Sequence, residues 1–161
     1  PLLPTTVLAP ERWAASFDEK HYSALHRLHI WNFAAQRITD APVIGWGLDA
    51  ARRIPGGDTK LAGGGNVMSV HTHNGSLQIW LELGAVGALI FAGLLAALWL
   101  RIAILEERSL RAGGTGLLLS ALMVANLSFG IWQTWWMASL ALSGLLFMIA
   151  QKLKLDERLN I

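Results

Sequence analysis

Apolar residues fill the second half of the chain in two long runs that contain no charged side chain. The first run covers residues 83–100 and the second covers residues 112–151, a stretch of 40 residues. As one helix, the second run would be roughly 60 Å long, about twice the thickness of a bilayer core. It therefore predicts two membrane spans, about residues 115–131 and 134–150, and the first run predicts another, about residues 77–105. One long helix is the alternative, and it would place the end of the chain on the other side of the membrane.

The front of the chain is more polar and has a different pattern. Residues 1–20 are predicted to be loop because prolines interrupt them. Residues 22–39 are predicted to form an amphipathic helix, since apolar residues recur at spacings of three and four: Leu25, Leu28, Trp31, Ala35 and Ile38. A glycine-rich loop follows at residues 52–66. A second helix is expected to begin near Asn74 or Gly75 and to run unbroken into the first span.

These patterns predict an all-α integral membrane chain, with a helical segment (residues 1–76) followed by three transmembrane helices (residues 77–161). Only 15% of the residues are charged, against about 25% in soluble domains. The chain begins without Met and has no signal-peptide pattern. We therefore expect it to be the C-terminal part of a longer protein, with earlier transmembrane helices that this sequence does not include.

The placement of charge predicts an orientation in the membrane. Residues 1–83 carry equal numbers of acidic and basic residues, whereas residues 84–161 carry two more basic than acidic residues. The basic residues of the second half flank the first connector or follow the last span: Arg101, Arg108, Arg111, Lys152, Lys154 and Arg158. Basic residues near span ends favour the cytoplasmic side. The tail, residues 151–161, is thus expected to be cytoplasmic, and residues 1–76 are expected to face outward.

Composition also excludes some chemistry. The chain has no cysteine, so disulfides and thiolate zinc sites are excluded. The basic residues do not form the stripe that a nucleic-acid partner needs.

The most distinctive polar cluster lies where the first span begins. Two histidines, His71 and His73, stand beside Asn74. A helix N-terminus carries partial positive charge and disfavours imidazolium, and a neutral histidine can accept a proton. This place suits chemistry that joins a lipid-borne substrate to a water-facing one. The alternatives are a His-x-His metal site and histidines that only cap or decorate the helix.

Arg27, on the amphipathic helix, is the candidate cation. A guanidinium aimed at the mouth of the span could bind a phosphate bidentately, and the alternative is a solvated side chain. Other basic residues have weaker claims to this role: Arg37, Arg52, Arg53 and Lys60. Gly84 and Gly87 are expected to permit close helix packing. The tryptophans near the last turn are expected to form an interfacial aromatic belt: Trp132, Trp135 and Trp136.

The order of these motifs resembles that of a known family. Arg-x-x-x-Trp (Arg27, Trp31) is followed by Pro-x-x-Gly-x-Gly (Pro42, Gly45, Gly47) and a glycine-rich loop. His-Asn-x-x-x-Gln-x-x-x-Glu-x-Gly then opens a span: His73, Asn74, Gln78, Glu82 and Gly84. Over about residues 24–87 the chain resembles the superfamily of O-antigen ligases and O-antigen polymerases of the bacterial envelope.

The resemblance implies a metal-independent, inverting glycosyltransferase of the bacterial inner membrane, with no cofactor and with residues 1–76 in the periplasm. Such enzymes take a glycan from undecaprenyl pyrophosphate, and the ligases transfer it to a sugar of the lipid A core. His73 matches the family's essential histidine, which activates or orients the acceptor hydroxyl. Arg27 matches an arginine that binds the donor pyrophosphate. Asn74 and His71 are further candidates for substrate binding.

Several alternatives stay open. The same motif is shared by O-antigen polymerases and protein O-oligosaccharyltransferases. A membrane transporter, like relatives labelled bicarbonate transporters, is an alternative of another class. Transport favours polar groups within the spans, and here the spans offer only Asn126 and a few Ser and Thr residues. A non-catalytic scaffold is the third possibility.

Overall fold

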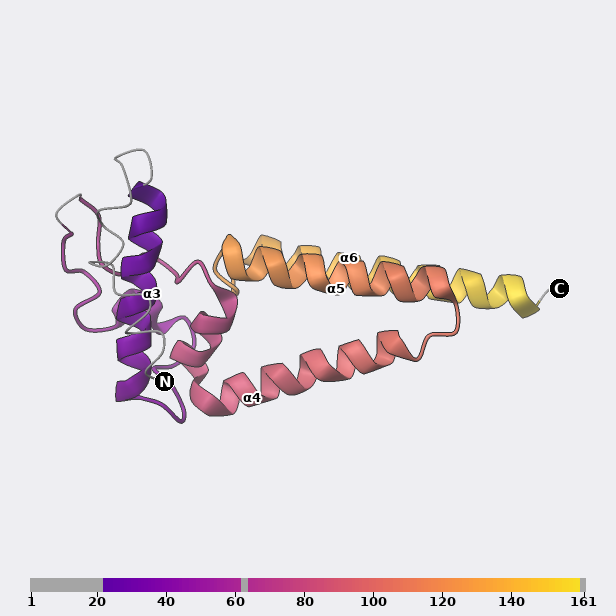
Figure 1. Cartoon of the computed structure of the whole chain (residues 1–161), viewed down its shortest axis with the longest axis horizontal. Helices are drawn as coiled ribbons and strands as arrows, with labels where there is room; N and C mark the ends of the chain where they lie inside the picture. Colours follow the sequence, from indigo (N-terminus) through magenta and orange to yellow (C-terminus); the bar gives the residue numbers. More distant parts are fainter. Residues whose placement is uncertain (1–21, 62–63, 160–161) are drawn as a thin grey trace.

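The structure, a computed structural model, describes residues 22–61 and 64–159 (Figure 1). Its regular elements are helices: α3 (Tyr22–Asp40), the 3-10 helix η3 (Ala50–Arg53), α4 (Gly75–Ala103), α5 (Arg108–Leu127) and α6 (Thr134–Leu159). Three of them, α4, α5 and α6, are long and apolar enough to cross a membrane. The described residues contain no strand beyond one isolated bridge between Lys60 and Asn66. The prediction of an all-α membrane chain is confirmed.

The long uncharged run folds as two helices. It contains most of α5 and of α6, which are separated by the turn at residues 128–133. In Figure 1, α4, α5 and α6 extend in the same direction, and α3 crosses them at one end of the molecule. The end of α6 and the connector between α4 and α5 lie at the opposite end. The start of α4 and the turn between α5 and α6 therefore lie at the same end of the three long helices as α3.

A small apolar core joins α3 to the start of α4. Ile30, Ala34 and Ile38 of α3 are buried against Leu81 of α4 and, with other residues, against the loop between the helices. The remaining buried members of this core are Phe33, Ala51, Ile54 and Met68. The predicted apolar stripe is partly wrong: Ile38 and Ala35 are buried, but Leu25, Leu28 and Trp31 are only half-buried. The buried face is centred instead on Ile30 and Ala34, because Ala51, Ile54 and Met68 of the following loop cover that side of α3.

A sharp kink interrupts α4, so the expectation of an unbroken helix is wrong. Gly84 has φ 64° and ψ −164°, a conformation open almost only to glycine. The segment before η3 docks into the kink. The amide of Gly47 donates to the carbonyl of Glu82 at 2.8 Å, and the amide of Ala85 donates to the carbonyl of Pro42 at 2.9 Å. These bonds satisfy backbone groups that a continuous helix would pair internally.

Glycine is required on both sides of this contact. A Cβ on Gly84 would lie 2.3 Å from the carbonyl carbon of Val43, and a Cβ on Gly45 would lie 2.4 Å from the carbonyl carbon of Glu82. Both neighbours are backbone atoms, which cannot rotate away. Gly84 therefore serves the close approach of a loop, whereas the sequence suggested the packing of another helix. The first part of α4, residues 75–83, is a short separate helix that packs against α3 through Leu81.

Candidate active site

The turn that precedes α4 presents the two histidines. Asn74 is the N-cap of α4, and its side-chain oxygen accepts a hydrogen bond from the amide of Leu77 at 2.9 Å. The hydroxyl of the buried Thr72 donates to the carbonyl of Asn74. The indole N–H of Trp31 donates to the carbonyl of Thr72 at 2.9 Å, which ties the turn to α3. His73 adopts a left-handed φ of 54°, which side-chain-bearing residues rarely adopt.

His73 is anchored to the end of α5. Its Nδ1 lies 2.9 Å from the carbonyl oxygen of Ser128. A carbonyl oxygen can only accept, so Nδ1 carries the proton in this contact. In the neutral ring the lone pair then lies on Nε2, the opposite nitrogen. The contact thus fixes both the direction of the ring and its tautomer, which is how a histidine base is commonly oriented.

Arg27 is held at the neighbouring carbonyl. Its Nη1 donates to the carbonyl oxygen of Leu127 at 3.0 Å. The last carbonyls of a helix have no partner within the helix and carry partial negative charge, so a guanidinium is favourable there. Leu127 and Ser128 are consecutive residues, and they bring together two side chains that are 46 positions apart in the sequence. One N–H of Arg27 is used for this anchor, and the guanidinium has four others.

His71 lies against His73. The two ring centroids are 4.1 Å apart with an edge-to-face angle of 65°. The amide of His73 donates to Nδ1 of His71 at 3.3 Å, so His71 carries its proton on Nε2 when neutral. Burial, together with the nearby charges of His73 and Arg52, lowers the pKa of His71 to about 4. His71 is therefore a neutral hydrogen-bonding group at the pH of a living cell.

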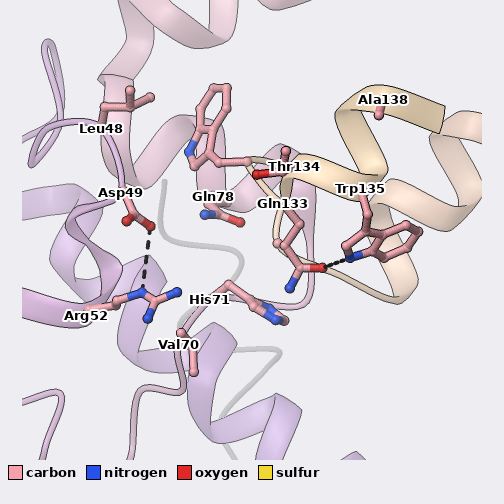
Figure 2. Close-up of a pocket in the computed structure, with 12 residues that line it drawn as sticks. Leu48, Asp49, Arg52, Val70, His71, Gln78, Gln133, Thr134, Trp135 and Ala138 are labelled. Atoms are coloured by element: carbon pink, nitrogen blue, oxygen red, sulfur yellow. Dashed lines mark hydrogen bonds and ion pairs between the residues drawn. The ribbon is translucent and has the colours of Figure 1, made fainter. Parts of the chain in front are cut away.

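Beside His71 lies a cavity of about 750 Å³. One wall comes from the loop and η3, with Asp49 and Arg52, and the other comes from the turn between α5 and α6 and the start of α6 (Figure 2). The polar and aromatic side chains along it are Asp49, Arg52, His71, Gln78, Trp132, Gln133, Thr134 and Trp135. Arg27 and His73 are not among the residues that line it. Arg27 therefore lies outside this cavity.

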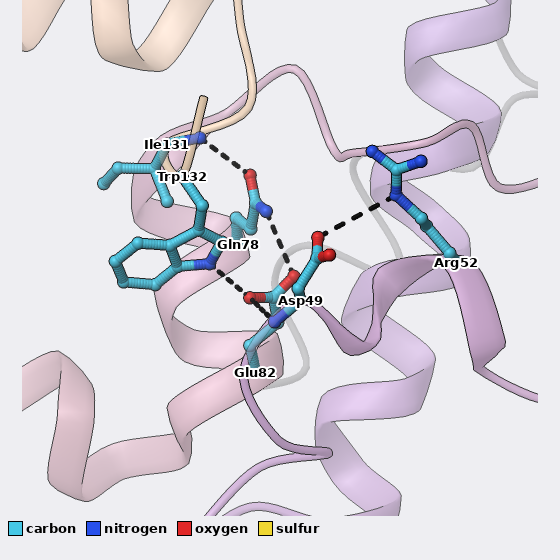
Figure 3. Close-up of polar contacts among 6 residues, drawn as sticks. All are labelled: Asp49, Arg52, Gln78, Glu82, Ile131 and Trp132. Carbon is cyan, nitrogen blue, oxygen red and sulfur yellow. Dashed lines mark hydrogen bonds and ion pairs between the residues drawn. The ribbon is translucent and has the colours of Figure 1, made fainter. Parts of the chain in front are cut away.

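A buried carboxylate holds the two walls in register (Figure 3). Glu82 is fully buried, and it accepts hydrogen bonds from the amide of Asp49 at 2.9 Å, from Nε2 of Gln78 at 3.0 Å and from the indole N–H of Trp132. Gln78, also buried, accepts from the amide of Ile131 at 3.1 Å. Neutral donors stabilise the carboxylate from several directions. This network connects α4 to the loop before η3 and to the turn before α6.

The structure places the other predicted residues as follows. Arg37 is paired with Asp40, and Lys60 bonds Asn66. Arg52 lines the cavity, although the sequence pattern favours Arg27 over Arg52 as the phosphate-binding cation. Trp136 is buried and therefore does not belong to an exposed aromatic belt. Asn74 has a structural role, since it is the N-cap of α4.

Sequence reasoning missed the network of Glu82. Gln78 and Glu82 belong to the motif that opens the first span, and the sequence pattern assigns them no role. The available signal was a carboxylate and an amide spaced one helical turn apart within an apolar stretch, because buried polar groups need partners. Among the described residues, no group of three or more His, Asp or Glu side chains could hold a metal ion.

With this geometry in place, comparison with known proteins identifies the family. Residues 5–92 match the O-antigen ligase family, which is more than half of the chain and includes the α3 segment, the histidine turn and the kinked start of α4. The chain belongs to the O-antigen ligase family. No solved structure matches it.

Curated relatives agree with this assignment. A protein of Rickettsia conorii, named as a candidate polysaccharide ligase, is 33% identical over 136 residues, which is 82% of this chain and 33% of the relative. A candidate polysaccharide ligase of Rickettsia prowazekii is 31% identical over 148 residues, which is 89% of this chain and 36% of the relative. The chain therefore spans about a third of the length of the curated relatives it matches.

Proposed function

We propose that this chain forms part of a bacterial inner-membrane glycosyltransferase, an O-antigen ligase that moves a glycan from undecaprenyl pyrophosphate to an acceptor sugar such as that of the lipid A core. The observation that carries the proposal is the pairing of Arg27 and His73 on consecutive carbonyls at the end of α5. Membership of the O-antigen ligase family supports it. The site lies at one end of three membrane-length helices, where a lipid-borne donor and a water-facing acceptor can meet.

His73 is the proposed base. Its Nδ1–H is committed to Ser128, so Nε2 receives the proton of the acceptor hydroxyl as that oxygen attacks the anomeric carbon. The new carbon–oxygen bond forms while the bond to the pyrophosphate oxygen breaks, and the bonding electrons leave with the pyrophosphate. Attack from the face opposite the leaving group inverts the anomeric centre. No metal or cofactor takes part in this sequence of bond changes.

Arg27 is the proposed group that binds the leaving pyrophosphate. Negative charge accumulates on that group during the reaction, and a preorganised cation stabilises charge where it develops. The anchor to Leu127 fixes the guanidinium in place. The N–H groups not used by the anchor can form the paired hydrogen bonds that arginine makes with phosphate oxygens.

The test is His73→Ala in the whole protein that carries this sequence. We expect loss of glycan transfer, measured as capped lipopolysaccharide in the bacterial envelope, because the base is gone while the cap and the spans are unchanged. The amount of the variant protein in the membrane fraction should equal that of the wild type. His29→Ala, a histidine on α3 outside the turn, is the matched control and should retain transfer. Normal capping in the His73 variant would refute the proposal.

The ligase and polymerase activities give different envelope glycans in a deletion strain. Loss of all long glycan from the lipid core indicates a ligase. Retention of a single repeat unit on the core indicates a polymerase. Normal lipopolysaccharide together with unmodified glycoproteins indicates a protein O-oligosaccharyltransferase.

A further inference from the structure

The cavity beside His71 has the features of a saccharide site. Trp132 and Trp135 both line it, and indole faces pack against the C–H faces of sugar rings. Asp49, Arg52 and Gln133 add planar polar groups that bind sugar hydroxyls. Its volume of about 750 Å³ lies within the range of about 300–1,000 Å³ usual for small-molecule sites. A short oligosaccharide fits these dimensions.

Both indoles are held in place before any ligand arrives. The indole N–H of Trp132 donates to the buried carboxylate of Glu82. The indole N–H of Trp135 donates to the side-chain oxygen of Gln133 at 3.0 Å, and the ring of Phe129 packs edge-on against it at 4.7 Å. Trp135 is nevertheless 50% exposed. An exposed aromatic ring with a fixed orientation loses little freedom on binding.

The charge of the cavity does not suit a pyrophosphate. Among the described residues that line it, the charged side chains are one acid and one base, Asp49 and Arg52, with Oδ1 of the first 3.9 Å from Nε of the second. A pyrophosphate would meet the carboxylate as well as the guanidinium. A sugar ring uses both groups, since its hydroxyls donate to a carboxylate and accept from a guanidinium. Arg27 is better suited to the anion, because its contact with the carbonyl of Leu127 leaves four N–H groups for phosphate oxygens.

The order of contacts places the cavity next to the proposed base. His71 lines the cavity and packs against His73, and His73 and Arg27 are anchored to consecutive carbonyls. A sugar in the cavity therefore meets His71, whose ring packs directly against the ring of the proposed base.

We propose that this cavity binds the acceptor sugar, the one that supplies the attacking hydroxyl, and that Trp135 is its stacking residue. The inference rests on the proposed function, and it assigns the second substrate, the acceptor, to this cavity. His71 acts as a hydrogen-bonding partner of the acceptor, through the Nε2–H that its contact with His73 defines. The donor pyrophosphate is bound at Arg27, outside the cavity.

The test is a two-substrate kinetic experiment on the whole protein in proteoliposomes. The donor is the undecaprenyl-pyrophosphate glycan, and the acceptor probe is the deacylated core oligosaccharide of the host lipopolysaccharide. Trp135→Ala is expected to raise KM for the acceptor roughly five- to tenfold and to leave kcat and KM for the donor unchanged. Trp135→Phe keeps an aromatic face and should restore the acceptor KM to near the wild-type value.

Trp99→Ala is the matched control, because Trp99 on α4 is similarly exposed, at 47%, and does not line the cavity. It should leave both KM values unchanged. A rise in the donor KM alone, or no change in either KM, would overturn the assignment of the cavity to the acceptor.

A direct binding measurement separates this inference from the proposed function. Calorimetric titration of the core oligosaccharide into the detergent-solubilised whole protein needs no turnover. Weaker binding to the Trp135→Ala protein than to the wild type supports the saccharide site even if His73→Ala retains transfer, which would refute only the proposed base. Equal binding to both proteins, alongside an inactive His73→Ala protein, refutes only the cavity.

Discussion

Two consecutive backbone carbonyls determine how Arg27 and His73 are presented. The carbonyls of Leu127 and Ser128 belong to the end of α5, where intrahelical partners run out. Each accepts a hydrogen bond from one of the two side chains. The anchors therefore serve both α5 and the candidate site. They pair carbonyls at the end of the helix, and they hold a guanidinium and an imidazole at two consecutive residues.

Arg27→Lys tests whether the planar guanidinium is needed. A lysine can bond the carbonyl of Leu127, but its ammonium is a point charge and cannot form a paired contact with a phosphate at the same time. We expect transfer to fall at least about tenfold, the effect of losing one charge-assisted hydrogen bond, with the protein still inserted. The measurement is the rate of glycan transfer in membranes. Wild-type activity would indicate that Arg27 only caps α5.

The first turns of α4 illustrate how a helix is shaped by the loop that contacts it. Glycines at positions 45 and 84 allow two backbones to approach within hydrogen-bonding distance. The resulting kink separates a short helix, which carries Gln78 and Glu82, from the membrane span. Because Glu82 then bonds the loop and the turn before α6, the kinked element positions both walls of the cavity.

Gly84→Ala should destabilise the protein by more than about 2 kcal/mol, since its conformation alone costs a side-chain-bearing residue about 1–3 kcal/mol and the new Cβ would collide with the backbone of Val43. The measurement is thermal unfolding in detergent, followed by size-exclusion chromatography. Gly93→Ala is the control, because a Cβ there meets nothing within 4 Å and alanine favours helix by about 1 kcal/mol. Equal melting temperatures for the two variants would contradict the role given to the kink.

Glu82→Gln should destabilise the protein by about 1–3 kcal/mol, the usual cost of leaving one buried polar group unsatisfied. Both carboxylate oxygens accept hydrogen bonds, so the new amide group must face a donor. Gln78 cannot turn to compensate, because its own oxygen accepts from Ile131.

The same thermal unfolding assay measures this effect. Glu157→Gln removes a carboxylate from an exposed ion pair with Lys154 and should leave the melting temperature nearly unchanged, because solvent screens such a pair. If Glu82→Gln and Glu157→Gln lower the melting temperature equally, the hydrogen bonds of Glu82 do not hold the two walls of the cavity together.

The chain as a whole consists of a polar end and three long helices whose apolar surfaces are largely exposed within the described residues. Within the described chain, only 6–11% of each apolar span window is buried. Lipid tails or further helices must cover the rest, since these surfaces are too apolar for water. The polar segment of α3 and the end of α6 lie at opposite ends of the spans. The basic residues within 84–161 lie at the ends of α4 and α6 and at the start of α5, toward the latter end.

This arrangement predicts a membrane topology that cysteine labelling can test. The chain has no cysteine of its own, so in a cysteine-free version of the whole protein each introduced thiol reports one position. In cells with a permeabilised outer membrane, an impermeant maleimide is expected to label Asp58→Cys in the exposed loop and not Lys152→Cys on α6. The reverse pattern would contradict the periplasmic placement of residues 1–76.

The sequence by itself determined the number of spans and the identity of the histidine turn. Charge-free length decides how many helices cross a membrane, because each crossing needs about 20 apolar residues, and an N-cap is a local signal in the residues themselves. The tertiary structure decided the rest. The kink at Gly84, the carbonyl anchors of Arg27 and His73, and the bonds from Asp49 and Trp132 to Glu82 all join segments far apart in the chain. Such contacts depend on which buried polar groups come together in the folded chain, and a local sequence pattern does not specify the hydrogen-bond partner of each group.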